Sequence, residues 1–340
     1  MKSIGYVGGK PLNSPDAFIE FEQDIPEPVG RDILVRIEAI SVNPLDTKVR
    51  GKTSEPQNPP LVLGWDAAGE VISIGEESKL FKPGDKVFYA GSIDRPGSNS
   101  QYQLVDERIV GSMPTTLSFE EAAAIPLTTI TAWEALFHRL QIPLSPKNQP
   151  PKNILILGGA GGVGSIAIQL ANKIAGLQVV ATASRPETEK WCRDLGAHQV
   201  INHHENIPSQ LRKTDFENVD YALIFNDTDK NFPPAAETIA PQGKICTIVE
   251  NQFPLDMGLL KAKSASFHWE FMFTRPVFKT ADIIEQHHLL NHVARLIDDG
   301  IIKTTVKEVL EPINIKNLIK AHTTLESGSS IGKIVLKGWL

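Results

Sequence analysis

The stretch NILILGGAGGVG, residues 153–164, decides the fold. Its first five residues form an apolar run typical of a buried parallel strand, and residues 165–175 read as a helix. The three spaced glycines predict a tight turn, close approach of the backbone to a pyrophosphate, and helix–strand packing, in that order. The N–H groups that begin the following helix favour bound phosphate. This pattern predicts a dinucleotide site whose contacts are Gly159, Ala160, Gly161, Gly162, Val163 and Gly164.

Strand and helix patterns alternate after this stretch. Helix-forming residues such as 188–195 separate a series of apolar runs, which predicts a doubly wound parallel sheet with helices on both faces. The further predicted strands are 178–183, 199–202, 219–225, 243–249 and 267–273. Ligands of such sheets bind at the carboxyl ends of the strands. The residues expected to contact the cofactor there are Asn226, Val249, Met272 and Phe273.

The end of the second strand bears on which dinucleotide binds. An NAD site usually carries Asp or Glu about 20 residues past the glycine turn. Here the chain has Ser184 and Arg185, whose hydroxyl and guanidinium suit a 2′-phosphate. We assign Glu187 to the following helix and take His203 as a further candidate for the phosphate rim. The sequence therefore predicts NADP(H), with a solvated Arg185 as the alternative.

The first part of the chain has a different pattern of predicted elements. Up to about residue 110, short strands such as 33–40, 67–75 and 85–90 are separated by Gly and Pro turns, which suggests an antiparallel, barrel-like unit. Helices are predicted at 118–124, 129–140 and 282–299, prolines 143, 146, 150 and 151 mark a loop, and residues 331–336 read as a strand. We expect this last strand to return to the first, β-rich domain.

Composition excludes several classes of protein. A net charge of -6 argues against nucleic-acid binding, and no apolar run approaches the roughly 18 residues of a membrane span. The only cysteines, Cys192 and Cys246, exclude a disulfide framework and fit a reducing compartment, so we expect core positions for both and a cytoplasmic protein.

Five segments carry a family resemblance: residues 41–50 (SVNPLDTKVR), 63–71 (LGWDAAGEV), 82–87 (KPGDKV) and 126–136 (PLTTITAWEAL), and the glycine turn. Through them the chain resembles the medium-chain dehydrogenase/reductase superfamily over essentially its full length, in the zinc-independent quinone oxidoreductase-like branch. The resemblance implies a GroES-like catalytic domain in two pieces, residues 1–126 and 274–340, and a Rossmann domain at 127–273, with the active site in the cleft. It also implies a homodimer, because the sixth strand of this fold often pairs across subunits.

Proteins of this superfamily differ in whether they bind a catalytic zinc, so the residues at the zinc-ligand positions matter. The motifs place Asn43, Trp65 and Leu127 where zinc alcohol dehydrogenases carry Cys, His and Cys. Catalytic zinc needs three protein ligands, which these residues cannot supply, so we expect no zinc. His288 and His292 have metal-binding spacing on the predicted long helix with His287, but no third ligand is evident, and a solvated helix face is expected.

Without a metal, a conjugated acceptor is the easier substrate. Hydride can add to a carbon that a distant carbonyl activates, and the charge spreads over an enolate or hydroquinone. A simple ketone would benefit far more from a Lewis acid. The sequence thus predicts an NADPH-dependent reductase of quinones or α,β-unsaturated carbonyls. A zinc-dependent alcohol dehydrogenase and an NADPH-binding protein with a regulatory or structural role stay open as alternatives.

The resemblance also implies which residues face the nicotinamide. Asn43 and Asp46 are expected in the cleft, with Asn43 as a donor to the substrate carbonyl, and Thr131 at the nicotinamide end. Asn43 as a turn residue and Asp46 as a helix cap are the alternatives. Lys48 stands where many relatives have tyrosine, so the proton donor stays open, solvent included.

Overall fold

The computed structural model describes residues 1–144 and 152–339. They form two compact units, the first made of Met1–Ile130 with Phe273–Leu340 and the second of Thr131–Met272. The chain therefore passes between the units twice, first inside helix α3 (Pro126–Trp133) and again directly after Met272. The sequence places these crossings at 126/127 and 273/274. Most of the predicted proline loop lies outside the described residues.

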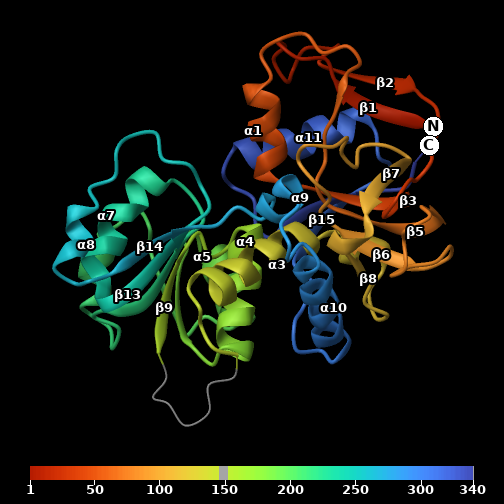
Figure 1. The fold of residues 1–340 in the computed structure, drawn as a ribbon. Helices are drawn as coiled ribbons and strands as arrows, with labels where there is room; N and C mark the ends of the chain where they lie inside the picture. The colour runs from red at the N-terminus through yellow and green to blue at the C-terminus, as the bar shows by residue number, and fades with distance from the viewer. Residues whose placement is uncertain (145–151, 340) are drawn as a thin grey trace. The chain divides into compact units, whose positions relative to one another are not determined.

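The second unit is built on a six-stranded sheet (Figure 1). The strand order is β11-β10-β9-β12-β13-β14, and all neighbours are parallel. From β9 the chain moves outward to β11 and then returns to β12 on the other side, as in a doubly wound fold. The strands are β9 (Asn153–Leu157), β10 (Gln178–Thr182), β11 (Gln199–Ile201), β12 (Val219–Ile224), β13 (Ile239–Thr247) and β14 (Ser266–Trp269).

Helices lie on both faces of this sheet (Figure 1). Helix α4 packs against α5, while α7 packs against both α6 and α8. The helices are α4 (Gly162–Gln169), α5 (Pro186–Leu195), α6 (Ile207–Leu211), α7 (Thr228–Thr238) and α8 (Gly258–Lys261), with π-helical turns at Glu134–Arg139 and Leu170–Ile174. Because both faces are covered, residues 154–157 of β9 are completely buried, which explains their apolar run.

Several predicted boundaries are wrong. The helix after the glycine turn begins at Gly162 rather than 165, and α3 begins at Pro126 rather than 129 because proline suits a first helical turn. The predicted fifth and sixth strands end early, at Thr247 and Trp269, so Val249, Met272 and Phe273 lie beyond their strands.

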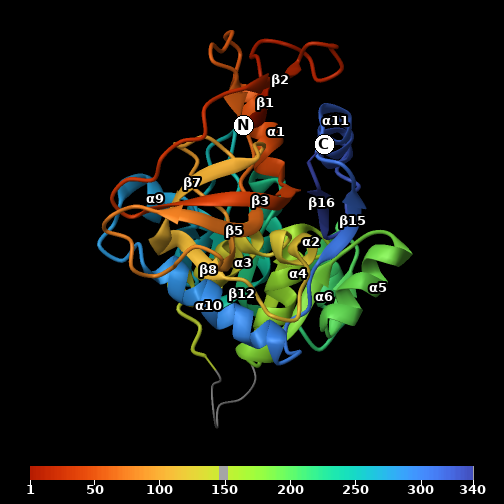
Figure 2. The same cartoon turned by 90° about the vertical axis from the view of Figure 1, so that its right-hand side faces the viewer.

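The first unit holds a seven-stranded sheet and a three-stranded sheet. The larger has the order β15-β16-β3-β5-β6-β8, with β7 also on β3, and the smaller has the order β2-β1-β4. The strands are β1 (Lys2–Tyr6), β2 (Phe18–Glu22), β3 (Asp32–Val42), β4 (Leu61–Val62), β5 (Ala67–Ile74), β6 (Lys86–Tyr89), β7 (Tyr102–Asp106), β8 (Val110–Ser112), β15 (Val306–Leu310) and β16 (Lys333–Lys337). Strand β16 pairs antiparallel with β3, so the predicted return of the tail is confirmed (Figure 2).

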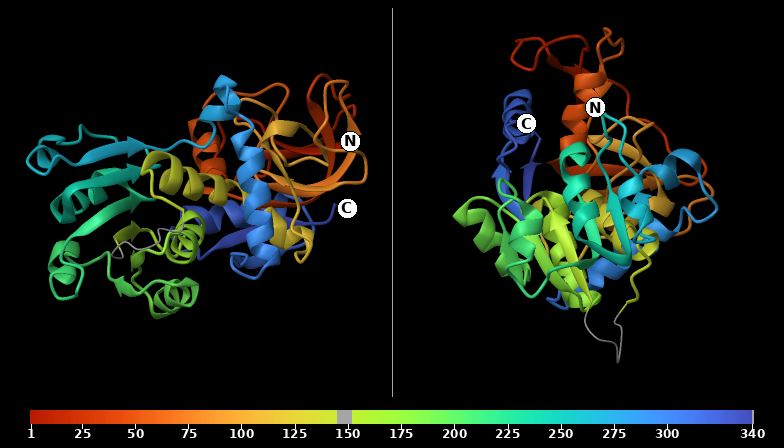
Figure 3. Two further views of the ribbon diagram at one scale, coloured as in Figure 1. Left: turned by 60° about the horizontal axis from the view of Figure 1, so that its bottom comes forward. Right: turned by 90° about the vertical axis from the view of Figure 1, so that its left-hand side faces the viewer.

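The helices of the first unit pack on these sheets. Helix α11 lies against α1, and α10 lies against β8 (Figures 2 and 3). They are α1 (Pro44–Lys52), α2 (Phe119–Ala123), α9 (Thr274–Phe278), α10 (Glu285–Asp298) and α11 (Ile315–Glu326), with a 3₁₀ turn at Glu107–Ile109. No helix within the described ranges is long and apolar enough to cross a membrane.

This packing decides the predictions about the two cysteines and about the histidines of α10. Cys192 and Cys246 are buried and unbridged, as expected for core residues. His287 is not on a solvated face, because its ring packs against Phe81 at 5.6 Å and Nδ1 lies 2.6 Å from the carbonyl of Val110. Only His288 of the three histidines is exposed.

Candidate functional site

The glycine turn joins β9 to α4 and is held by the end of β10. The N–H groups of Gly158 and Gly159 donate to the side-chain hydroxyl and the carbonyl of Thr182, at 3.0 and 3.2 Å. Gly161 is the N-cap of α4 and has no side chain to occupy the helix N-terminus. The first N–H groups of α4 have no acceptor within the helix and are not covered by a side chain of Gly161, as a pyrophosphate site needs.

The individual glycines have distinct roles. Gly158, which precedes the first glycine of the motif, has a left-handed backbone conformation with φ of +93°. A Cβ on Gly159 would lie 3.1 Å from Cys192 Sγ, and one on Gly164 would lie 2.2 Å from the carbonyl oxygen of Gly158, so both glycines permit close packing. A Cβ on Gly161 would meet only that oxygen, at 3.5 Å. Space is therefore left at Gly161.

Ser184 and Arg185 follow the end of β10 after Ala183, and both are half-buried. Arg185 caps α5: its N–H donates to Thr188 Oγ1 at 3.1 Å, which fixes the start of that helix. Its guanidinium lies 3.5 Å from the Glu187 carboxylate. Glu187 thus belongs to the helix, as expected, and it also offsets part of the Arg185 charge.

The other predicted contacts of the second unit lie at the carboxyl edge of the sheet. The side-chain oxygen of Asn226 lies 3.2 Å from the position of a Cβ on Gly158, so Asn226 borders the glycine turn. The carbonyl of Val249 accepts from Thr228 at the start of α7. His203 follows β11 and lines a pocket of about 680 Å³ with Lys230 and other residues of α6 and α7. Burial lowers the pKa of His203, so this imidazole is a poor fixed cation for a phosphate.

Three predicted residues lie where the chain passes between the units. Thr131 is buried in α3 at the first crossing. Met272 and Phe273 flank the second crossing and are buried, whereas Phe271 is 46% exposed. In the first unit, the Phe273 ring packs edge-on against Trp65, with centroids 6.4 Å apart.

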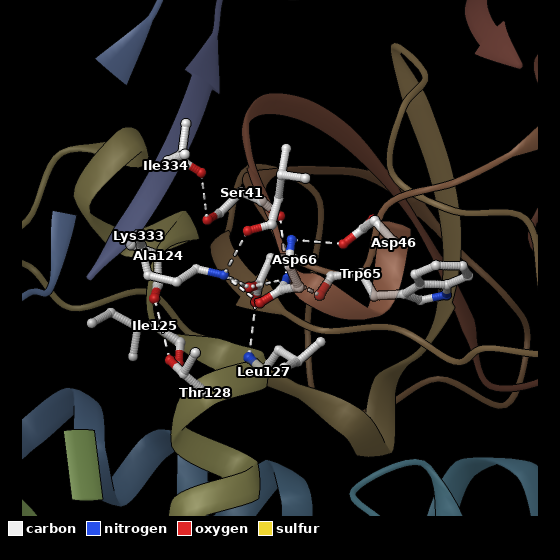
Figure 4. A network of polar contacts seen from close by, with 12 residues as sticks. Ser41, Asp46, Trp65, Asp66, Ala124, Ile125, Leu127, Thr128, Lys333 and Ile334 are labelled. Carbon is white, nitrogen blue, oxygen red and sulfur yellow. Dashed lines mark hydrogen bonds and ion pairs between the residues drawn. The ribbon is translucent and has the colours of Figure 1, made fainter. Parts of the chain in front are cut away.

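A buried polar cluster forms the centre of the first unit (Figure 4). Asn43 lies between β3 and α1, Asp66 precedes β5, and Lys333 begins β16. Their side chains meet inside the protein, where Lys333 Nζ lies 3.0 Å from Asp66 Oδ2. The other Asp66 oxygen accepts from the N–H of Leu127 at 2.8 Å, which caps the first turn of α3. Four separate segments are therefore joined by one ion pair and its hydrogen bonds.

The Asn43 amide is fully engaged within this cluster. Its Nδ2 donates to Asp66 Oδ2 at 2.9 Å and to the carbonyls of Ser41 and Trp65, both at 3.3 Å. Its Oδ1 accepts from Lys333. Both N–H groups of Asn43 therefore already have internal acceptors in this arrangement, so the predicted bond from Asn43 to a substrate carbonyl would have to replace one of them.

The two carboxyl groups of the cluster are perturbed by burial. Asp46 accepts from the N–H of Asn43 at 2.7 Å, so it also fills the alternative role of helix cap. Burial raises the pKa of Asp46 to about 7 despite this hydrogen bond and the nearby Lys333. Burial also raises the pKa of Asp66, against the opposing effects of Lys333 and Asn43. Near neutral pH, Asp46 is thus poised between its acidic and ionised forms.

A catalytic zinc does not fit these residues. The Trp65 ring points away from Lys333 (Figure 4), and its Nε1 donates to the carbonyl of Ser92 at 3.2 Å. Leu127 offers only its backbone N–H to the cluster. The oxygens of Asn43 and Asp66 already face an ammonium group. Among the described residues, no group of three or more His, Cys, Asp or Glu could hold a metal ion.

Sequence reasoning did not identify Asp66 or Lys333 as site residues. Both lie in segments that carry recognisable patterns, GWD at 64–66 and IGKIVL at 331–336. A lysine inside an otherwise apolar strand is a signal for a buried cation, because lysine is almost never fully buried unless it is paired. The identity of the partner could not be read from either segment.

Two family models match separate parts of the chain. Residues 30–131 match the model "Alcohol dehydrogenase GroES-like domain", and residues 195–336 match "Zinc-binding dehydrogenase". The chain is 42% identical over 336 residues to a zinc-type alcohol dehydrogenase-like protein of Staphylococcus epidermidis, which covers 99% of each chain.

Solved structures share the whole fold. A putative zinc-dependent alcohol dehydrogenase from Rhizobium etli CFN 42 is 48% identical, with a TM-score of 0.95, and covers 100% of this chain and 98% of its own. Escherichia coli quinone oxidoreductase, solved with NADPH, is 24% identical, with a TM-score of 0.83 and coverage of 99% and 100%. The chain therefore belongs to the zinc-type alcohol dehydrogenase-like proteins of the medium-chain dehydrogenase/reductase superfamily, and it is an oxidoreductase.

Proposed function

We propose that this chain is an NADPH-dependent reductase that reduces a quinone or an α,β-unsaturated carbonyl without a metal ion. The observation that carries the proposal is the donor set of the cluster, in which Asn43 and Asp66 face the Lys333 ammonium and Trp65 and Leu127 offer no ligand side chain. Without a Lewis acid, an acceptor that spreads its own developing charge has the lower barrier.

The glycine turn and the end of β10 would hold the cofactor. The N–H groups at the start of α4 would bind the pyrophosphate, since Gly161 leaves them accessible. Ser184 and Arg185 would bind the 2′-phosphate, and Asn226 lies beside the turn. When bound, NADPH supplies the hydride. Thr131, Met272 and Phe273 stay in the proposal as the residues at the nicotinamide end.

Within the first unit, Asn43 and Asp46 hold neighbouring residues in position and do not donate hydrogen bonds to the substrate. The Asn43 amide links Asp66 to the backbone of β3, and Asp46 ties the start of α1 to Asn43. The Asp46 carboxyl group holds or releases a proton near neutral pH, because burial brings its pKa to about 7. The final proton on the product is supplied by solvent in this proposal.

We further propose a cytoplasmic homodimer that pairs through β14. This strand is the last of the six-stranded sheet, so its outer edge has no neighbour among the described strands. Trp269, the last residue of β14, and Phe271, two residues further on, are each 46% exposed. An open edge with exposed aromatic side chains favours pairing with a second copy.

The proposal is tested by following oxidation of NADPH and NADH with four panels of acceptors: quinones, enones, saturated ketones and aldehydes. We expect turnover with at least one conjugated panel, faster with NADPH, and little with the saturated compounds. Turnover confined to the saturated panels would contradict the proposal, as would NADPH binding without turnover on any panel.

A further inference from the structure

The Lys333 ammonium is a buried cation with a complete set of partners. The residue is 3% exposed. Its Nζ donates to the carbonyl of Val42 at 3.2 Å, to Asp66 Oδ2 at 3.0 Å and to Asn43 Oδ1 (Figure 4). An ammonium group has three N–H donors, so three acceptors satisfy it. The group is thus bound as a small cation would be, by one carboxylate, one amide and one carbonyl oxygen.

The partners of Lys333 connect it by hydrogen bonds to the starts of two helices, α1 and α3. Asp66 accepts a hydrogen bond from Lys333 through Oδ2. Through Oδ1 it accepts from the N–H of Leu127, a residue in the first turn of α3. Asn43 accepts from Lys333 and is the N-cap of α1. Removal of the ammonium would leave Asp66 as a buried charge with no cation among its described partners. Such a charge either takes up a proton or turns towards water.

The same oxygens leave no room for zinc. Asn43 stands at the position of one zinc ligand of the zinc alcohol dehydrogenases, and its only acceptor oxygen points at Lys333. The bonds of Asn43 Nδ2 to the carbonyls of Ser41 and Trp65 hold the amide in this orientation. Zinc binding would therefore need both displacement of the ammonium and rotation of the amide, and Trp65 and Leu127 would still supply no ligand side chain.

We propose that the Lys333 ammonium is the resident cation of this centre, in place of a metal ion, and acts as a positioning residue. It orients the Asn43 amide and the Asp66 carboxylate, and through them the starts of α1 and α3. Helix α3 carries Thr131, so the effect of Lys333 on turnover rests on the proposed function. The effects of Lys333 on hydrogen exchange in α3 and on the metal content of the protein do not rest on the proposed function.

The test compares three variants of β16. Lys333→Met removes the cation but keeps the length of the side chain, and Lys333→Arg keeps the charge. Lys337→Met is the matched control, since Lys337 lies on the same strand and pairs with Glu120 at the surface. In Lys333→Met we expect kcat with the best conjugated acceptor to fall on the order of 10²-fold. The Kd for NADPH should change less than about threefold, because the glycine turn belongs to the other unit.

Hydrogen exchange gives a readout that needs no turnover. The Leu127 amide should exchange at least about tenfold faster in Lys333→Met than in the wild type, and close to the wild-type rate in Lys333→Arg and Lys337→Met. A Lys333→Met/Asp66→Leu double variant removes both charges and covers the case in which the single variant does not fold. It should fold and still show low kcat.

Chemical rescue separates a positioning cation from a merely structural one. In Lys333→Ala, propylammonium should restore part of kcat, whereas tetramethylammonium, which has no N–H donor, should not. Wild-type protein should contain no stoichiometric zinc. Unchanged protection of Leu127 together with unchanged kcat in Lys333→Met would overturn the proposal, as would equal rescue by both ions. If the wild type shows no turnover, the proposed function fails, and the exchange and zinc measurements still decide the role of Lys333.

Discussion

Arg139 and Glu270 form an ion pair in the second unit, with Nε 2.7 Å from Oε2, and it links the turn after α3 to the residue after β14. The Glu134 carboxylate lies 3.8 Å from the same guanidinium, so one arginine faces two completely buried carboxyl groups. Burial, together with the neighbouring Glu134, raises the pKa of Glu270 to about 8. The pair thus retains a proton at a pH at which an exposed glutamate has lost it.

This ion pair predicts a pH dependence of stability. The ordinary pKa of glutamate is 4.5, below the folded value of about 8, so the folded protein binds the proton more tightly between these limits. The contribution of Glu270 to the free energy of unfolding should therefore decrease as pH rises through this window. Glu270→Gln lacks this dependence, and its melting temperature relative to the wild type should rise from pH 5 to pH 8.5. The same scans on exposed Glu217→Gln are the control, and a constant difference for Glu270→Gln would contradict the assignment.

Cofactor choice should depend on Arg185. Loss of a charge-assisted hydrogen bond costs roughly 1.5–3 kcal/mol, so Arg185→Ala should weaken NADPH binding by about 10- to 100-fold and leave NADH almost unchanged. Titration of intrinsic fluorescence with each dinucleotide measures both constants. Glu187→Gln is the matched control, because it removes the carboxylate that lies 3.5 Å from Arg185, and it should maintain or strengthen NADPH binding. An equal loss of affinity for NADPH and NADH in Arg185→Ala would show that this residue does not bind the 2′-phosphate.

Two glycines of the turn should respond differently to alanine. Gly164→Ala places a Cβ 2.2 Å from a backbone oxygen, so it should destabilise the fold by about 1–3 kcal/mol or more. Gly161→Ala meets only one atom, at 3.5 Å, so it should keep its stability and lose affinity for the dinucleotide. Chemical unfolding and a dinucleotide titration separate the two effects.

Gly51→Ala is the control for alanine itself. Gly51 lies in α1, and an added Cβ would meet no atom within 4 Å apart from its chain neighbours and the backbone of its own helix, so this variant should be at least as stable as the wild type. If Gly161→Ala binds the dinucleotide as tightly as the wild type, the turn is not the pyrophosphate site.

The proposed dimer should depend on the edge of β14. Trp269→Lys places a charge beside that edge, so it should convert the dimer to a monomer, as measured by light scattering after size-exclusion chromatography. Phe278→Lys is the control, because Phe278 is 74% exposed and belongs to the other unit. A wild-type monomer, or a Trp269→Lys dimer, would exclude pairing through β14.

Local patterns explain why much of the second unit could be predicted. The run at 153–157 is apolar because β9 is covered on both faces, and the glycine spacing follows from the packing of a turn, a strand and a helix that are neighbours in sequence. The ends of β13 and β14 were less predictable, since the apolar residues continue beyond the last hydrogen-bonded pair. Sequence hydrophobicity reports burial, and it does not report where pairing stops.

The polar cluster could be predicted only in part. Asn43 and Asp46 are recognisable from a continuous motif, but Asp66 and Lys333 are 267 residues apart, and nothing local pairs them. Asp66 and Lys333 come into contact because β16, near the C-terminal end of the chain, pairs with β3. The internal use of the Asn43 amide follows from that long-range contact, which is why the sequence alone suggested a free donor.

The central claim is that this oxidoreductase reduces a conjugated acceptor without a metal ion. The most direct measurement takes protein dialysed against a strong chelator, determines its zinc content by elemental analysis, and follows NADPH oxidation with the best quinone or enone in the same sample. Full turnover at a zinc content far below one ion per chain is the predicted result. Stoichiometric zinc in the untreated protein, with activity lost on chelation and restored by zinc, would contradict the claim.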